Sequence, residues 1–448
     1  MDIARERHPL AALLRSRRWT AAAFLRQVAE RHCALGYGGM ASRKEKVSRW
    51  IAGAAVPEIT TQYAMAALLG IGQREVDARG WPTWLLAASS EDRAVLESPW
   101  TPAGSVTVLG EMGGPVDRRG FLIASSSALA AMVAQWTTAE PAAAAAGGRR
   151  IGAGVADQLD TRLAALRHLD DEIGSASVYD AATTEIRLIR ALLTNTSHSQ
   201  QVGRRLYGAA AEACRLAGWC AYDSGHHADA ERHFIAALRS AASGDDDTTG
   251  ALTLAFWANQ RYTTGDPRGA LDLLDGALAN RRVTSPRLLA LLHARRARAH
   301  SLLKEPVQAY RAIEAAFSVL GHAPPARADL AALYWLNTGE LHQFAGSSAL
   351  SLSEPRRALE HFDAAVNGED AYDSGQEVRG AAIYLARRSE AHLALGDLDA
   401  AVEVAEQVLQ LMGGVESARG SSALNDLRSG LRGHRHVPLV NTFLNATA

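Results

Sequence analysis

Cysteine is scarce in this chain of 448 residues, occurring only at Cys33, Cys214 and Cys220. The odd number and the wide spacing argue against a disulfide framework, and no CxxC pair offers ligands for zinc. The adjacent His226 and His227 also lack the spacing of a zinc site. Neither a metal nor another cofactor is expected, and this cysteine usage indicates a reducing cytoplasm.

A long hydrophobic run is also missing. No stretch of about 20 uninterrupted apolar residues occurs, so a membrane-spanning helix is not expected. The opening residues MDIARERHPL are charged where a signal peptide needs an apolar core. The pair Arg118-Arg119 imitates a twin-arginine export signal, but its internal position favours a buried connecting helix. The sequence therefore predicts a cytoplasmic protein without a membrane partner.

Catalytic motifs are absent as well. No glycine-rich phosphate loop precedes a strand pattern, and no strand carries a nucleophile. The sequence thus offers no sign of an enzyme. A hydrophobic fraction of 48% is normal for a globular protein. The length predicts two or three domains.

Lysine is the scarcest charged residue, with three occurrences among 47 lysines and arginines. Two of them, Lys44 and Lys46, lie close together in the stretch SRKEKVSRWIAG. Residues 1–80 carry 13 basic and 7 acidic residues, although the net charge of the whole chain is only −1. A basic segment on a mildly acidic remainder indicates that this segment contacts a polyanion.

Short helices are expected throughout residues 1–89. Thr20 can cap one of them, and Ser42 can cap another over 43–52, which Gly53 closes. The helix over 43–52 has the layout of a DNA-recognition helix, whose first side chains reach base edges in the major groove. Its apolar residues Val47 and Ile51, four apart, face inward.

Double-stranded DNA is therefore the predicted partner of this helix. The residues expected to contact DNA are the basic ones and the capping serine: Ser42, Arg43, Lys44, Lys46 and Arg49. Such domains bind two half-sites as dimers, so a homodimer is expected. The alternative is that the basic cluster is only a solvated helix face.

The next segment, 90–154, has the composition of a linker. SPWTPAGSV and EMGGP are rich in turn-forming residues, and EPAAAAAGGRR is of low complexity. One apolar helix is expected within it, over 118–136. Helix patterns then continue over 155–432, and a tail is expected over 433–448.

Five segments within 217–409 share one layout: a small residue, a turn, and a helix that carries an alanine. The aligned alanines are Ala230, Ala270, Ala309, Ala358 and Ala401. The predicted turns lie near Gly225, Gly265, Lys304, Gly346 and Gly396. This layout resembles the tetratricopeptide repeat, a stacked pair of helices. The long interval before Ala358 is assigned to an insertion at 347–353.

Repeat arrays of this kind present a concave surface that binds partners. The register predicts that side chains of the first helix of each repeat face this groove. They are Trp219, Tyr222, Asn259, Tyr262, Arg298, Glu340, Gln343 and Glu390. The expected occupant is a small molecule, a peptide or a partner protein, and the alternative is that these residues only pack between repeats.

The order of motifs along the chain resembles a known family. VSRWIAGAAVPEITTQYAMAALLGI (47–71) is similar to the second half of the XRE, or Cro/repressor-like, helix-turn-helix. Together with GWPTWLL, LRHLDDEIG and the repeats, it resembles actinobacterial XRE-type transcriptional regulators with a tetratricopeptide-repeat domain. The resemblance implies an all-α chain with a helix-turn-helix domain and an α-solenoid, which regulates transcription in the cytoplasm.

One departure from that family keeps a second hypothesis open. The segment before Ser42 is about ten residues longer than the family usually has. The alternative is therefore a repeat-based interaction scaffold whose N-terminal domain does not bind DNA.

Overall fold

The computed structural model describes residues 8–16, 19–69, 71–88, 90–112, 126–368, 370–372, 378–412 and 417–446. Within these ranges the chain is built from helices, which confirms the predicted all-α class. The two strands found there, β1 (Arg149–Arg150) and β2 (Thr196–Ser197), are two residues long and pair in parallel. The Arg118-Arg119 pair lies outside the described residues.

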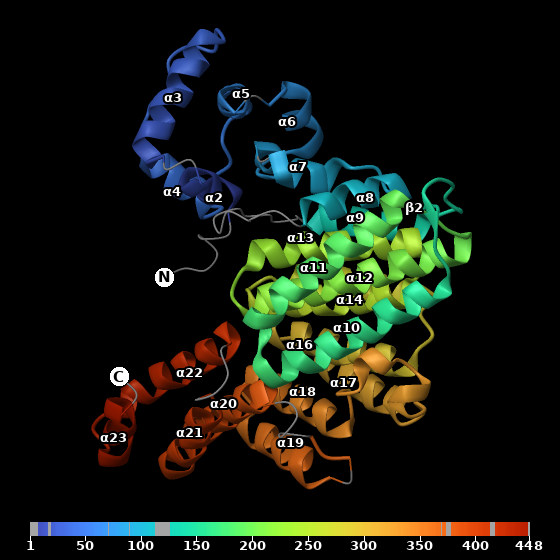
Figure 1. Cartoon of the computed structure of the whole chain (residues 1–448). Helices are drawn as coiled ribbons and strands as arrows, with labels where there is room; N and C mark the ends of the chain where they lie inside the picture. The colour runs from blue at the N-terminus through green and yellow to red at the C-terminus, as the bar shows by residue number, and fades with distance from the viewer. Residues whose placement is uncertain are drawn as a thin grey trace.

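The N-terminal helices form a small group with its own hydrophobic core, called the head below (residues 8–88). Figure 1 shows it in blue beside the larger helical body. Its elements are α2 (Pro9–Ser16), α3 (Ala21–Ala34), α4 (Glu45–Ile51), α5 (Ile59–Leu68), α6 (Gln73–Arg79) and the 3-10 turn η1 (Thr83–Ala88). Thr20 caps α3 by accepting a hydrogen bond from the Ala23 amide, as predicted.

A buried tryptophan organises the core of the head. Trp84 has no exposed surface, and its indole nitrogen donates to the Gln62 side chain at 3.0 Å. The Gln62 amide nitrogen in turn donates to the Pro57 carbonyl at 2.8 Å. Phe24 and Leu25 of α3 pack in the same core. The buried polar groups are thus hydrogen-bonded, and they fix the chain before α5 against η1.

The segment over 90–154 is not a linker. Its helices α7 (Ser90–Glu97), α8 (Pro102–Glu111) and α9 (Ser126–Thr138) place apolar side chains in the main core of the body. The buried Arg239 donates to the carbonyls of Leu96, Ser98 and Pro99, and so holds the connection between α7 and α8. The turn-rich composition concealed α7 and α8, whose helical spacing of apolar residues is confined to short stretches. Helix α9 lies largely within the apolar helix expected over 118–136.

The body continues with helices α10 to α23. They are α10 (Ala153–Ile173), α11 (Ser175–Asn195), α12 (Gln200–Asp223), α13 (His227–Gly244), α14 (Asp247–Thr263), α15 (Pro267–Ala279), α16 (Pro286–Leu302), α17 (Pro306–Leu320), α18 (Thr338–Ser351), α19 (Pro355–Asn367), α20 (Val378–Ala394), α21 (Leu398–Met412), α22 (Ala418–Leu431) and α23 (Pro438–Ala446). The predicted C-terminal tail contains α23, whose Val440 and Phe443 pack into a core with α22. It is therefore part of the folded body.

From α12 to α21 the helices pack in consecutive pairs. The first helix of each pair also contacts the first helix of the next, from α12 through α14, α16 and α18 to α20. Helix α10 contacts both α12 and α20. Figure 1 shows α12, α14 and α16 in the middle of the molecule, with α18 and α20 below them. The first helices therefore surround a common centre, and α10 closes the gap between the first and the last.

The five aligned alanines mark equivalent positions in these pairs. Each of them has 0% exposed surface, as the close packing of paired helices requires. The position twelve residues earlier is also small in every pair, and two of these residues are glycines. A Cβ at Gly218 would lie 2.8 Å from the Phe234 ring, and one at Gly346 would lie 2.6 Å from the Phe362 ring. Side chains larger than glycine therefore do not fit there.

The fourth pair corrects the predicted register. Gly346 lies inside α18, and the turn to α19 is made by Ser353, whose φ is 67°. Residues 347–353 are therefore the end of α18 and its turn, equivalent to the segment that leads to Gly225, and not an insertion. The additional residues lie before α18, in the connection over 321–337. Glycine is typical of turns, which is why Gly346 was assigned to one, but it occupies the small packing position that Gly218 holds in the first pair.

Candidate functional site

The predicted DNA-contacting residues are gathered around α4 of the head. Val47 and Trp50 are buried and anchor this helix, with 2% and 5% of their surface exposed. Ile51 is half-buried and packs against the same core. The polar side of the helix is therefore directed toward solvent. The predicted residues there are exposed, except for the half-buried Lys46: Ser42, Arg43, Lys44, Lys46 and Arg49.

The start of α4 differs from the prediction. The helix begins at Glu45, with Lys44 at the N-cap position and no side-chain cap. The amides of Lys46 and Val47 instead donate to the carbonyls of Arg43 and Lys44, in a tight turn that satisfies them without Ser42. Arg43 therefore precedes the helix. Helix α4 ends just before Gly53, whose φ is 69°, as predicted.

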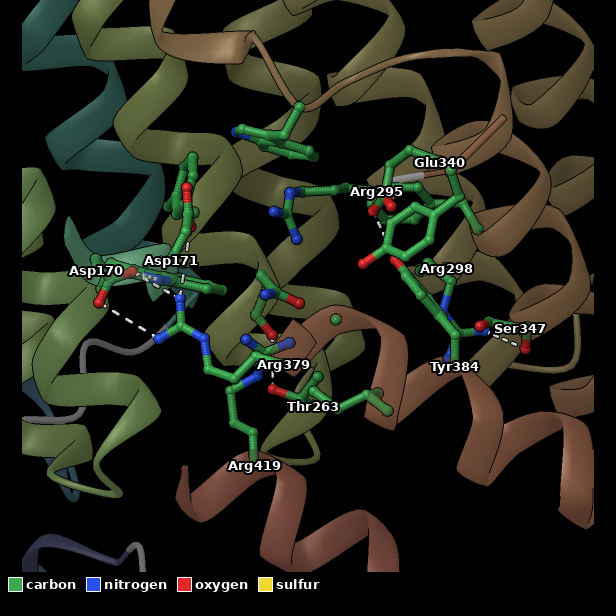
Figure 2. Close-up of a pocket in the computed structure, with 18 of the residues that line it drawn as sticks. Asp170, Asp171, Thr263, Arg295, Arg298, Glu340, Ser347, Arg379, Tyr384 and Arg419 are labelled. Atoms are coloured by element: carbon green, nitrogen blue, oxygen red, sulfur yellow. Dashed lines mark hydrogen bonds and ion pairs between the residues drawn. The ribbon is translucent and has the colours of Figure 1, made fainter. Parts of the chain in front are cut away.

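A cavity lies at the centre of the body. The space between its side chains is about 1040 Å³, counting the part that is open to solvent. Its wall is made by α10, by the first helix of every pair, by α22 and by the connection before α18. Figure 2 shows side chains from these elements converging on one space.

The cavity collects most of the predicted groove residues. Five of the eight line it: Trp219, Asn259, Tyr262, Arg298 and Glu340. Tyr222 and Gln343 are buried next to the wall and do not line it, and Glu390 lies one turn beyond Arg387 on α20. Tyr222 is occupied by a hydrogen bond of 2.6 Å to the Thr263 hydroxyl. The predicted helix face is thus the one that points inward.

Arg379 joins α20 to α10 on one side of the cavity. Its guanidinium group donates to Asp170 at 2.7 Å, to Asp223 at 3.1 Å and to the Ser175 hydroxyl at 2.6 Å. Burial disfavours these charges, but their mutual attraction raises the pKa of Arg379 and lowers the pKa of Asp170. Asp171 is half-buried beside Asp170, and its partial burial raises its pKa to about 6. We call these four charged residues the Arg379 cluster (Arg379, Asp170, Asp171 and Asp223).

Three other arginines of the wall have no carboxylate partner. Among the described residues, no Asp or Glu lies within ion-pair distance of Arg295, Arg298 or Arg387. Arg295 and Arg298 are only 4% and 5% exposed. Arg298 donates to the Ser347 carbonyl and the Ser301 hydroxyl. Burial lowers the pKa of Arg298 to about 9, and the charge of Arg387 adds to this effect.

Aromatic rings lie between these cations. The ring centroid of Phe256 is 4.5 Å from the Arg215 guanidinium and 5.3 Å from that of Arg295. Trp219 and Trp335 meet the same ring edge-on, at centroid distances of 5.1 and 6.5 Å. Cations placed over ring faces are stabilised by the ring quadrupole. The wall therefore combines positive charge with flat apolar surface.

Glu340 is the acidic group on the opposite side of the cavity. Burial raises its pKa to about 7, although the hydrogen bond from Tyr384 and the charges of Arg295 and Arg419 act in the other direction. The Tyr384 hydroxyl donates to Glu340 at 2.6 Å. In Figure 2 the guanidinium group of Arg295 extends into the space between this pair and the Arg379 cluster. Near neutral pH, Glu340 thus neutralises Arg295 only in part.

Several functional residues of the cavity are absent from the prediction. Phe256, Arg295 and Phe344 lie three or four residues from predicted ones on the same helices, so extending the face by one turn would have found them. Asp170 lies in LRHLDDEIG, before the first repeat. Trp335 comes from a connection whose sequence has no periodic pattern, and only the tertiary structure brings it to the wall.

Comparison with protein-family models, with curated proteins and with solved structures finds no significant match to this chain. What the site binds is accordingly inferred from its residues. Among the described helices, none has the length and apolar character that a bilayer span requires.

Proposed function

We propose that this chain is a DNA-binding transcriptional regulator whose body receives a signal in the central cavity. The head is then a helix-turn-helix domain and the body a tetratricopeptide-like solenoid. The observation that carries the proposal is the arrangement around α4: Arg43, Lys44 and Arg49 are exposed, while Val47 and Trp50 anchor the helix from behind. A helix held in this way can enter a major groove with its basic side first.

The roles of the basic residues differ in this proposal. Arg43 and Lys44, at the start of α4, read base edges, since arginine and lysine match the acceptors of guanine. Arg49, one turn later and exposed, contacts a phosphate. Two copies of the chain bind two half-sites one helical turn apart, or a multiple of it, because a single short helix makes few contacts.

Binding to promoter DNA tests these roles. Replacing Arg43 or Lys44 by alanine is expected to cost about 1–3 kcal/mol and to relax the sequence preference. Replacing Arg49 by alanine should weaken binding to all sequences alike and lower the salt slope by about one unit. Gel shifts of the chain's own promoter and of scrambled DNA, at several salt concentrations, measure both effects. If all three variants bind as the unmodified chain does, α4 is not the reading helix.

One observation favours a second candidate function, an interaction scaffold that does not bind DNA. Helix α4 has seven residues, and an irregular segment over 35–44 separates it from α3. A short turn between α3 and α4 would fix the orientation of α4 relative to α3. The longer irregular segment fixes that orientation less firmly, and so also the way in which α4 could enter a groove. The same gel shift separates the candidates, because a scaffold would bind neither DNA.

A further inference from the structure

We propose that the cavity of the body binds a small amphipathic anion. The acidic group of this ligand meets Arg295 and Arg387, and its apolar, ring-bearing part lies against the aromatic wall. The inference rests on the proposed function in one respect, since it assigns a chemical class to the signal that the body receives.

Charge is the first argument. Seven arginines line the cavity, and four of them pair with carboxylates that do not line it: Arg167 and Arg215 with Glu212, and Arg379 and Arg419 with Asp223. The carboxylates of the wall itself are Asp170, Asp171 and Glu340. Two of these carboxylates are committed to Arg379, the first at 2.7 Å and the second at 3.8 Å. Arg295 and Arg387 have no carboxylate partner in the described part of the chain. The space that they face therefore has a positive potential, which favours an anion.

The buried state of Arg295 is the second argument. Only 4% of its surface is exposed, its Nε has no hydrogen-bond partner, and one Nη donates to the Tyr262 hydroxyl at 3.1 Å. A buried cation with unsatisfied donors destabilises a folded protein unless something compensates for the lost hydration. An acidic group in the cavity supplies that compensation, through the bidentate geometry that guanidinium groups offer to carboxylates and phosphates.

The aromatic wall selects a ligand with a flat apolar part. Phe256, Phe344 and Trp335 line the same space as Arg295. The guanidinium of Arg295 lies 5.3 Å from the Phe256 centroid and 5.7 Å from that of Phe344. Rings next to a cation can bury an apolar group while the cation holds the acid beside it. A bare inorganic anion would leave this surface unused.

The closure of the cavity favours a small molecule over an extended peptide. On one side Arg379 connects α20 to α10 through Asp170. On another, the Tyr334 hydroxyl donates to Asp171, so that the connection before α18 also reaches α10. Both bridges lie in the wall of the cavity. A peptide lying along the inner helices would have to break these contacts, whereas a small molecule held between the side chains of the wall would not.

Fluorescence titration of the full chain tests the proposal with two dyes of nearly the same ring skeleton. Anilinonaphthalene sulfonate is anionic, and phenylnaphthylamine is neutral. The anionic dye should bind about tenfold more tightly than the neutral one. Arg295→Leu and Arg387→Leu should each weaken the anionic dye about tenfold and leave the neutral dye unchanged. Equal affinities for the two dyes, or unchanged affinity in both variants, would overturn the proposal.

Arg388→Leu is the matched control. It removes a cation from the same turn of α20, but Arg388 pairs with Asp363 at 2.7 Å and does not line the cavity. Anionic dye binding should be unaffected by this change. Thermal melts by circular dichroism establish that each variant folds, and Arg295→Gln, which removes the charge but keeps a polar group, replaces Arg295→Leu if the latter does not. A structural role for Arg295 would lower the melting temperature, whereas a ligand role would not.

Displacement of the anionic dye distinguishes the acidic groups. Displacement by naphthoate assigns a carboxylate, and displacement by naphthyl phosphate assigns a phosphate. Equal displacement by naphthalenemethanol, which is neutral, would refute an anion site. The gel shift described above is independent of these titrations. If the chain binds the anionic dye but not DNA, the regulator proposal is refuted and the anion-site proposal stands. If it binds DNA but not the dye, the anion-site proposal is refuted and the regulator proposal stands.

Discussion

The cations of the head and those of the body lie in opposite surroundings. In the head, Arg43, Lys44 and Arg49 are exposed on a short helix, whereas in the body Arg295 and Arg298 are almost fully buried. Exposed cations can contact a polyanion of any shape, with a strength that falls steeply with salt. Buried cations accept only an anion that fits their cavity, and salt screens them much less. Under the two proposals, one chain would contain two anion-binding surfaces that differ in selectivity because they differ in burial.

The most severe test of this separation is Val47→Asp. It places a carboxylate in a core where the valine is 2% exposed, at an expected cost of more than about 4 kcal/mol. The head should unfold and DNA binding should disappear, while the body continues to bind the anionic dye. Gel shifts and dye titrations of the same preparation measure both. Ser48→Asp, with the same charge on the exposed neighbour, should leave the head folded. Loss of dye binding in Val47→Asp would show that the two regions are not independent.

Within the body, Arg379→Met separates paired cations from unpaired ones. It leaves Asp170 and Asp223 buried without their partner, so unfolding in urea should be destabilised by about 3–5 kcal/mol. Arg388→Met breaks a pair whose side chains are 29% and 53% exposed, and should cost no more than about 1 kcal/mol. If both variants lose the same stability, the Arg379 cluster is not the closure that its geometry indicates.

The smallest expected effect concerns pH and Glu340. The groups that face Glu340 are Tyr384, Arg295 and Arg419, yet burial outweighs them and raises the pKa of Glu340 to about 7. Below that pH Glu340 is neutral and Arg295 is free for a ligand, whereas above it the carboxylate competes with the ligand. Affinity for the anionic dye should therefore fall severalfold, up to about tenfold, between about pH 6 and about pH 8.

Glu340→Gln is the control for this pH dependence. Glutamine keeps the size and the hydrogen bonding of the residue but cannot ionise, so the variant should bind the dye with similar affinity across the same range. The same titration of Glu340 also makes the stability of the fold depend on pH. Because the folded pKa is raised, the contribution of Glu340 is fully present at low pH and is lost as the pH rises through about 7. A binding curve that tightens with pH would contradict this assignment.

The spacing of residues along the sequence predicted part of the fold. The remainder depends on contacts between helices that are far apart in the sequence. The buried alanines and the inward helix face follow from residue spacing, and that spacing placed Trp219, Tyr262 and Arg298 in the wall. Ser42 was assigned as a cap because a serine precedes the helix, but the backbone satisfies those amides itself. Composition concealed α7 and α8, since turn-forming residues lie between short apolar stretches, whereas the apolar helix expected over 118–136 overlaps α9.

The spacing of residues along the sequence could not predict which charged groups pair in the cavity. Arg379 meets Asp170 only because the stacked pairs curve until α20 reaches α10. The curvature depends on small rotations between neighbouring pairs, which no residue pattern encodes directly. Nor does the sequence distinguish the paired Arg379 from the unpaired Arg295, because that difference depends on which carboxylates arrive nearby.

The bond between Arg379 and Asp170 joins positions 209 residues apart. In an open array of helix pairs each pair contacts only its neighbours, and unfolding can begin at either end. Here the last pair cannot fray without releasing α10, so we expect the pairs to unfold together rather than from one end. A contact of such long range also forms late in folding. During synthesis the wall is incomplete until Arg419 has left the ribosome. If the cavity binds the proposed anion, a growing chain would not yet bind it, because the wall is not complete.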